Sequence, residues 1–373
     1  MKKHNPLVRT APLVVLAVIA SLLLQAPTYY FPLVFKNGPA PLYSTSYYIQ
    51  NGDPALMYDL GCQLGMRDAT TPGTQDSLVI LDFGKMWIFN NIQGNTTIGV
   101  RTFGDPNNGG ARQNLSISDL EIRAQNFARG YWVCSANDKA SQLTLGIGTN
   151  TFDFFNQENY AQDNLRAIMV DFGRNWANMI NRLNGWGATT GYNLQVLFTG
   201  AIDIEWAGPD PADGLYYWHS PYVVRGWVDA FDASDNKKSI FFNFGACVGC
   251  PTSPSLSWRY NNALPWSQED VWYVSWGSQP AFAVPEIYRN DGYLARQWAA
   301  VSKAGALYFG SRIIFTGAMT QMQACQQRGG TECLTLDNTP AEGWGQLLDA
   351  VNAETYTAQP FPQYSTDIKW QFK

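Results

Sequence analysis

The sequence is poor in histidine, which narrows the chemistry open to it. Among 373 residues there are only His4 and His219, and His4 lies in an N-terminal segment with the features of an export signal. A Ser–His or Cys–His nucleophilic pair would depend on His219, and no Gly-x-Ser-x-Gly elbow is present to partner it. A zinc site built on Cys247 and Cys250 would need two further ligands, which the sequence hardly offers. We therefore expect no metal and no cofactor.

Charged residues are also scarce, at 15% of the chain with a net charge of −5. No basic block occurs beyond the extreme N-terminus, whereas nucleic-acid phosphates are bound by Lys- and Arg-rich surfaces. The Gly-x-Gly-x-x-Gly turn of dinucleotide sites and the Gly-x-x-x-x-Gly-Lys-Ser/Thr phosphate loop are both missing. These absences argue against a nucleic-acid partner and against nucleotide chemistry.

Residues 1–26 have the pattern of a signal peptide. An apolar run at residues 11–24 follows the basic residues Lys2, Lys3 and Arg9. This run is short for a membrane-spanning helix. An uncleaved membrane tether through residues 11–24 is the alternative, because residues 21–26 lack a clean small-x-small cleavage site. In both cases we expect the body of the protein outside the cytoplasm, secreted or at the cell surface.

The six cysteines agree with that location, since an even count in an exported chain suggests disulfides. Cys325 and Cys333, which close a short polar loop, are the favoured pair. Cys247 and Cys250 are compatible with a local bridge, a redox pair or half a zinc site. A structural role is favoured because no thioredoxin-like βαβ pattern surrounds them.

Strand-like and helix-like segments alternate along most of the chain, which predicts a parallel sheet. Seven strand candidates fit a (β/α)8 TIM-like barrel with one βα unit missed or degenerate, and a doubly wound open sheet is the alternative. The predicted strands span residues 55–61, 78–84, 143–148, 194–205, 240–246, 271–276 and 312–318. The predicted helices span residues 118–134, 162–183, 222–231, 292–303 and 341–351. The predicted organisation is signal or anchor at 1–26, lead-in at 27–53, barrel at 54–355 and C-terminal tail at 356–373.

Residues 194–208, LQVLFTGAIDIEWAG, begin with the apolar run of a buried strand, and two acidic residues, Asp203 and Glu205, follow this run. Residues two apart on a strand share a face, so Asp203 and Glu205 point to the same side. In a (β/α)8 barrel the site is built at the C-terminal ends of the strands. The other polar or aromatic residues predicted at such ends are Asp82, Asp59, Trp206, Asn243, Tyr273 and Trp276. Glu286, in the Pro-flanked stretch AVPEIY, could reach the site, but surface exposure is the favoured expectation.

Two carboxylates suffice for glycoside hydrolysis, one held protonated and the other acting as an anion. Burial and a nearby negative charge both raise a carboxyl pKa, and Glu205 between Asp203 and Trp206 could meet both conditions. Asp203 could instead polarise an acetamido group on the substrate. A purely structural explanation is that Asp203 and Glu205 pair with Arg225 or Arg259, or cap the following turn.

A strand that ends Asp-x-Glu resembles the catalytic strand of TIM-barrel glycosidases acting on N-acetylated sugars, the family 18 chitinases and, more closely, the family 25 lysozymes. The latter also carry an early-strand Asp, a context that Leu81-Asp82-Phe83-Gly84 and Tyr58-Asp59-Leu60-Gly61 both resemble. The resemblance implies that Glu205 is the acid, Asp203 its helper, and Asp82 or Asp59 a positioning carboxylate. The stretch VWYVSWG at residues 271–277 is similar to the aromatic late strand that lines the sugar cleft. Positions 199–201 hold Thr-Gly-Ala where the family 18 pattern has further Asp residues.

The sequence thus predicts an exported, monomeric glycoside hydrolase whose partner is a polysaccharide, with N-acetylated cell-wall glycan as a candidate. One alternative is a catalytically inactive barrel that binds glycan or an envelope partner. Another is a structural or adhesive surface protein, in which case the strand-end carboxylates should not converge.

Overall fold

The computed structural model describes residues 40–372 apart from 91–92, 137, 152–160, 206–219, 237, 248 and 261–264. Within these residues, none of the helices combines the length and the apolar character needed to cross a membrane. The predicted signal or tether at residues 1–26 lies outside the described part of the chain.

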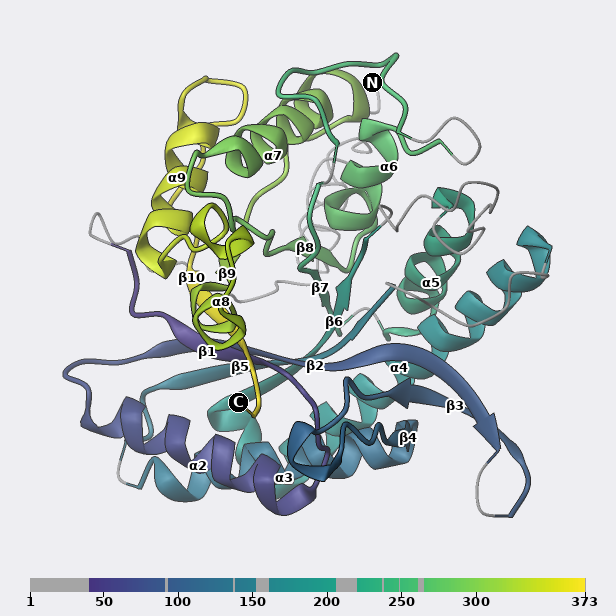
Figure 1. Ribbon diagram of the computed structural model, residues 1–373, viewed down its shortest axis with the longest axis vertical. Helices are drawn as coiled ribbons and strands as arrows, with labels where there is room; N and C mark the ends of the chain where they lie inside the picture. Colours follow the sequence, from purple (N-terminus) through teal and green to yellow (C-terminus); the bar gives the residue numbers. More distant parts are fainter. Residues whose placement is uncertain are drawn as a thin grey trace, which may run out of the picture. The chain divides into compact units, whose positions relative to one another are not determined.

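Eight parallel strands form a nearly closed barrel, as predicted (Figure 1). Their hydrogen-bonded order is β8-β7-β6-β5-β2-β1-β10-β9, and parallel bridges from Ala283 to Phe315 and from Glu286 to Met319 join the two edges. The order therefore follows the chain once around the barrel. The strands are β1 (Ser44–Tyr48), β2 (Asp76–Asn90), β5 (Gln142–Asn150), β6 (Val196–Asp203), β7 (Phe241–Asn243), β8 (Ala281–Ala283), β9 (Gly317–Thr320) and β10 (Tyr364–Trp370).

Helices connect the barrel strands on the outside. Several begin at a side-chain cap followed by proline, whose missing N–H costs nothing at a first helical position. Examples are Asp53-Pro54, Ser220-Pro221 and Thr339-Pro340. The α-helices are α2 (Pro54–Thr70), α3 (Ile117–Cys134), α4 (Gln162–Thr190), α5 (Pro221–Ser234), α6 (Gln268–Trp272), α7 (Tyr293–Ala304), α8 (Met322–Arg328) and α9 (Pro340–Asn352). Short 3-10 and π turns are η1 (Pro106–Asn108), η2 (Tyr192–Leu194), η4 (Tyr273–Gly277), η5 (Gly305–Phe309) and η6 (Glu332–Leu334).

An antiparallel extension leaves the barrel at the end of β2. The pairing register of β2 with β5 shifts between Asp82 and Lys85, and beyond this bulge β2 pairs with β3 (Thr96–Arg101), which pairs with β4 (Asn114–Ser116). Gly84 at the bulge has φ of 92°, a conformation that favours glycine. A Cβ there would also lie 2.5 Å from the Arg101 carbonyl oxygen. The bulge thus ends the barrel part of β2 immediately after Asp82.

Several predicted elements are wrong. Residues 55–61 belong to helix α2, because Asp53 caps the Ala55 N–H at 2.7 Å and Pro54 opens the helix. Residues 271–276 belong to helix α6 and the π turn η4. A capping box formed by Ser267 and Asp270 begins α6. The predicted lead-in and tail also contain barrel strands, since β1 and β10 pair in parallel from Ser44–Thr366 to Tyr48–Trp370.

The three disulfides include both local pairs anticipated from spacing. Cys325 is bonded to Cys333, and Cys247 to Cys250. The third, Cys62–Cys134, joins α2 to α3. These helices approach closely at glycines, because a Cβ on Gly61 would lie 2.0 Å from the Phe127 carbonyl oxygen. The α2–α3 pair is therefore fixed by both packing and a covalent bond.

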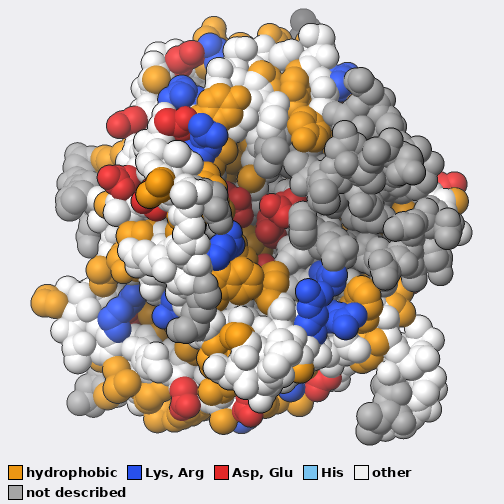
Figure 2. Space-filling model, in the orientation of Figure 1, with side chains coloured by type: hydrophobic (Ala, Val, Ile, Leu, Met, Phe, Trp, Pro, Cys, Tyr) orange, Lys and Arg blue, Asp and Glu red, His pale blue; other side chains and the backbone are white. Residues whose placement is uncertain are grey.

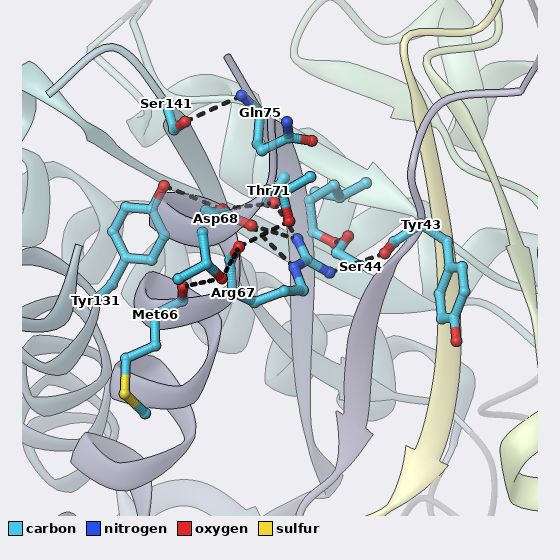
Figure 3. Close-up of polar contacts among 12 residues, drawn as sticks. Tyr43, Ser44, Met66, Arg67, Asp68, Thr71, Gln75, Tyr131 and Ser141 are labelled. Carbon is cyan, nitrogen blue, oxygen red and sulfur yellow. Dashed lines mark hydrogen bonds and ion pairs between the residues drawn. The ribbon is translucent and has the colours of Figure 1, made fainter. Parts of the chain in front are cut away.

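A buried polar network centred on Asp68 ties the start of the barrel together (Figure 3). The Asp68 carboxylate accepts hydrogen bonds from the Arg67 guanidinium, from the Ser77 hydroxyl on β2 at 3.0 Å and from the Tyr131 hydroxyl on α3 at 3.2 Å. Arg67 also donates to the Tyr43 carbonyl, next to β1, at 2.8 Å. This carboxylate is paired and saturated, so its role is structural.

Candidate active site

Asp203 and Glu205 stand at the C-terminal end of β6, as predicted. Thr151, at the end of β5, fixes the backbone that carries them. Its hydroxyl accepts a hydrogen bond from the Glu205 N–H at 2.9 Å and lies 3.0 Å from the Glu205 carbonyl and 3.2 Å from the Asp203 carbonyl. The Thr151 N–H also donates to the Asp203 carbonyl at 2.9 Å. The two carboxyl groups therefore project from a rigid strand end.

Both carboxyl groups are withdrawn from water, Asp203 almost completely and Glu205 with partial exposure. Burial raises the pKa of Glu205 to about 7. Burial, and then the charges of Glu205, Glu286 and Asp82, raise the pKa of Asp203 well above its usual range. A carboxyl group with such a pKa keeps its proton near neutral pH, which a general acid requires.

Asp82 lies behind this pair at the β2 bulge and is completely buried. Its carboxylate accepts hydrogen bonds from the Gly84 N–H at 2.8 Å and from the Asn150 side-chain amide at 3.3 Å. Burial, opposed in part by these bonds, raises the pKa of Asp82 to about 7, and the charge of Glu205 adds to the rise. Asp82 does not itself line the cavity described below, but Asn150, which donates to it, does.

Glu286 is a fourth carboxyl group of the site, and the expectation of surface exposure was wrong. It is 6% exposed and follows β8, where its bridge to Met319 helps close the barrel. The Tyr288 hydroxyl donates to the Glu286 carboxylate at 2.7 Å. Burial first, and then the charge of Glu205, raise the pKa of Glu286 well above its usual range, while the Tyr288 bond opposes the rise.

These groups open into one cavity of about 580 Å³ at the C-terminal end of the barrel. Asp203, Glu205 and Glu286 line it, together with Asn150, which contacts Asp82. Figure 2 shows acidic side chains inside a hollow on this face, with basic and apolar side chains beside them. The convergence contradicts the scattered carboxylates expected of a purely structural protein.

Aromatic rings form one wall of the cavity. Tyr48, Phe103 and Trp370 all line it, and the rings pack together with centroid distances of 4.7 Å for Tyr48–Trp370 and 5.3 Å for Phe103–Trp370. Burial, followed by the charges of Glu286 and Asp203, raises the pKa of Tyr48 well above its usual range. The Tyr48 hydroxyl therefore stays protonated beside these carboxyl groups, and the rings offer an apolar face to the cavity.

The other predicted site residues that the structure describes do not line this cavity. Asp59 is exposed on helix α2, not at a strand end. Tyr273 and Trp276 lie on the π turn η4, where they donate to Asp229 at 2.8 Å and to the Ser311 hydroxyl at 3.0 Å. Asn243 does end β7, but its buried amide donates to the Ser275 hydroxyl at 2.9 Å. Trp206 lies outside the described residues.

The alternative that arginines neutralise Asp203 and Glu205 does not match the observed contacts. Arg225 pairs with Asp270 at 2.9 Å. Arg259 donates to the carbonyls of Leu256 and Trp258. The Oδ1 atom of Asp203 has no hydrogen-bond partner among the described residues. Within the same residues, no group of three or more His, Cys, Asp and Glu side chains is arranged to hold a metal ion.

Comparison of the sequence with known protein families and with curated proteins gives no match. Among solved structures, the Ignisphaera aggregans GH53 catalytic domain is similar with a TM-score of 0.38 and 10% identity, over 84% of this chain and 76% of that one. A similarity of this degree carries no information about activity. The barrel assignment stands on the strand order, and the resemblance to the family 25 lysozymes and family 18 chitinases stays a prediction.

Proposed function

We propose that the protein is an exported glycoside hydrolase that uses carboxyl groups as its acid and its anion. The observation that carries this proposal is the convergence of Asp203, Glu205 and Glu286 in one cavity at the C-terminal end of the barrel, with Asp82 behind them. Glycoside hydrolysis requires two carboxyl groups that differ in protonation and flank the scissile bond. The disulfides are compatible with an oxidising compartment.

Glu205 is assigned as the general acid. It combines a pKa of about 7 with partial exposure to the cavity, so it holds a proton and can reach a leaving oxygen. Glu286 is assigned as the second carboxyl group. Because burial and the charge of Glu205 raise its pKa well above the usual range, it acts as the anion only after it has released its proton, and the hydrogen bond from the Tyr288 hydroxyl favours that ionised form. Asp203 is the helper beside Glu205, and it can polarise an acetamido group if the substrate carries one.

The proposed substrate is a polysaccharide, with cell-wall glycan containing N-acetylated sugars as the first to test. Its rings would stack on the wall formed by Tyr48, Phe103 and Trp370. Stacking of this kind needs an apolar ring face, which pyranose sugars provide.

Glu205→Gln should abolish release of reducing ends from such a glycan while folding is unchanged, because a general acid contributes roughly 10²–10⁴ in rate. Aryl glycosides whose leaving group needs no protonation should lose much less. In the wild type, kcat/KM should fall about tenfold per pH unit above pH 7, as Glu205 loses its proton. Initial rates of sugar release, measured with far-UV circular dichroism as a folding check, test these expectations.

Glu269→Gln, the same chemical change on the exposed face of α6, is the matched control and should leave the rate unchanged. If the wild type cleaves nothing in a broad glycan panel, the hydrolase proposal fails. If the wild type and Glu205→Gln both bind saccharide and neither cleaves it, the protein is an inactive glycan-binding barrel.

A further inference from the structure

Five cationic side chains line the same cavity as the carboxyl groups: Lys85, Arg101, Arg112, Arg289 and Arg328. Arg289 is held by Asp291 at 2.6 Å. By contrast, Arg101, Arg112 and Arg328 form no ion pair with any carboxylate that the structure describes. Hydrolysis by carboxyl groups does not require guanidinium groups, so these three arginines need a separate explanation.

The three arginines come from two different parts of the fold. Arg101 ends β3 and Arg112 precedes β4, both in the antiparallel extension that leaves β2 at its bulge. Arg328 ends helix α8, which follows β9. All three are at least partly exposed, so they can bind a ligand without first losing a buried contact.

Aromatic rings orient two of these guanidinium groups and link the two parts of the fold. Arg101 lies 4.9 Å from the centre of the Trp87 ring, and Arg328 lies 5.7 Å from the centre of the Trp370 ring. Phe103, two residues after Arg101, packs against Trp370 with ring centres 5.3 Å apart. The cations therefore flank the aromatic wall on which a sugar ring would stack.

We propose that the glycan bound in this cavity is anionic, with carboxylate or phosphate groups that contact Arg101, Arg112 and Arg328 while a sugar ring stacks on Phe103 and Trp370. Arginine matches both groups because its planar fork can donate two hydrogen bonds to one carboxylate or phosphate. The inference names the substrate class of the hydrolase proposed above and rests on that proposal for turnover, but not for binding.

The carboxyl groups that line the cavity limit where the anionic groups of the glycan can lie. A negatively charged substituent at the scissile bond would lie against Asp203, Glu205 and Glu286, which are withdrawn from water and offer it no cationic partner, whereas the exposed arginines attract one. The charged substituents therefore belong to sugar units that flank the cleaved bond, not to those that contact Glu205. The whole chain carries a net charge of −5, which by itself would repel an anionic polymer. The three arginines provide a local positive field that attracts such a polymer to the cavity.

The test is calorimetric binding to the Glu205→Gln protein, which separates binding from cleavage. Three oligosaccharide probes of equal length are compared: a polyuronate, a sugar phosphate polymer linked by phosphodiesters, and a neutral β-linked glucan. We expect the polyuronate, the phosphodiester polymer or both to bind at least tenfold more tightly than the neutral glucan at 50 mM salt. This preference should shrink at 500 mM salt, because exposed charges are screened.

Arg101→Gln, Arg112→Gln and Arg328→Gln, each added to Glu205→Gln, should weaken binding of the preferred anionic probe about tenfold, as the loss of a charge-assisted hydrogen bond predicts. Binding of the neutral glucan should be unchanged. Arg174→Gln is the matched control, since it removes one exposed positive charge from helix α4 outside the cavity.

Equal binding of anionic and neutral probes, no binding of either anionic probe, or anionic binding that survives all three cavity substitutions would overturn this inference. If neutral glycans are then cleaved by the wild type, the hydrolase proposal still stands. Anionic binding that depends on the arginines, without cleavage of any glycan, supports the inference and rejects the hydrolase proposal. A preference for the polyuronate or for the phosphodiester polymer identifies which anionic group is recognised.

Discussion

Asp82 is a buried carboxyl group whose two described hydrogen bonds come from neutral donors, the Gly84 N–H and the Asn150 amide. Its pKa of about 7, against an ordinary 3.8, means that the folded protein holds a proton which the unfolded chain releases at lower pH. The favourable contribution of this proton to folding is complete below pH 3.8. It is lost progressively as the pH rises through 7.

Asp82→Asn should therefore stabilise the protein at pH 8 by about 2–4 kcal/mol and have little effect at pH 4, since each unit of pKa shift corresponds to about 1.4 kcal/mol. Urea unfolding at several pH values measures this difference. Asp171→Asn, the same substitution on the exposed face of α4, is the matched control whose change in stability is subtracted at each pH. A loss of stability at pH 8 equal to that at pH 4 would contradict the expectation.

The residues of the site were predictable only where a strand gave the register. Asp203 and Glu205 follow a long apolar run, so their shared face could be inferred from alternation alone, and Asp82 follows a similar run. Glu286 follows Ala281–Ala283, a three-residue strand too short to show a period. The Tyr288 bond and the bridge to Met319 that bury Glu286 depend on distant parts of the chain, which local sequence does not report.

Helices α2 and α3 show how close packing and glycine position are linked at the scale of elements. A Cβ on Gly130 would lie 2.0 Å from the Tyr58 carbonyl oxygen and 2.8 Å from the Cys62 nitrogen. Both of these atoms belong to backbone and cannot rotate away. The disulfide Cys62–Cys134 holds the helices at this same crossing.

Gly130→Ala should consequently destabilise the protein by about 2–4 kcal/mol, because the helices must separate or bend to admit the methyl group. Gly185→Ala is the matched control on helix α4, where an added Cβ meets no atom within 4 Å. It should stabilise the protein by up to about 1 kcal/mol through helix propensity. Thermal unfolding of both variants with the disulfides intact measures the contrast. Equal melting temperatures would show that the α2–α3 contact is looser than described.

Several elements could not be assigned from periodicity because their residues break the usual rule for strands. β1 reads STSYY and β10 reads YSTDIKW, with hydroxyl and acidic residues where buried parallel strands usually have Val, Ile or Leu. These side chains are buried and bond to one another, as Ser46 and Thr366 do at 2.7 Å. Residues 55–61, in contrast, form an apolar run too short to distinguish a helix from a strand without its cap.

At the scale of the whole molecule, the barrel depends on β10, although its residues fall in the stretch predicted as a tail. β10 pairs with β1 on one side and with β9 on the other. Asp367 on β10 is completely buried, and its carboxylate accepts hydrogen bonds from the Thr320 hydroxyl at 2.6 Å and the Met322 N–H at 2.8 Å. Removing this strand would expose the edges of both neighbours.

A chain that ends at residue 363 should therefore fail to fold, with no cooperative thermal transition by circular dichroism. Lys369→Ala keeps the strand and alters only a partly exposed side chain. Its free energy of unfolding should be within about 0.5 kcal/mol of that of the wild type. A cooperative transition in the truncated chain would show that seven strands suffice and would restore the tail interpretation.

The pairing of β1 with β10 also sets the order in which the protein can be made. Ser46 and Thr366 are 320 positions apart, so the contact that completes the barrel forms only after nearly the whole polypeptide has been synthesised. Contacts between residues this distant form slowly during folding. A nascent chain therefore lacks its final fold until its synthesis is nearly complete, a condition compatible with the export proposed above.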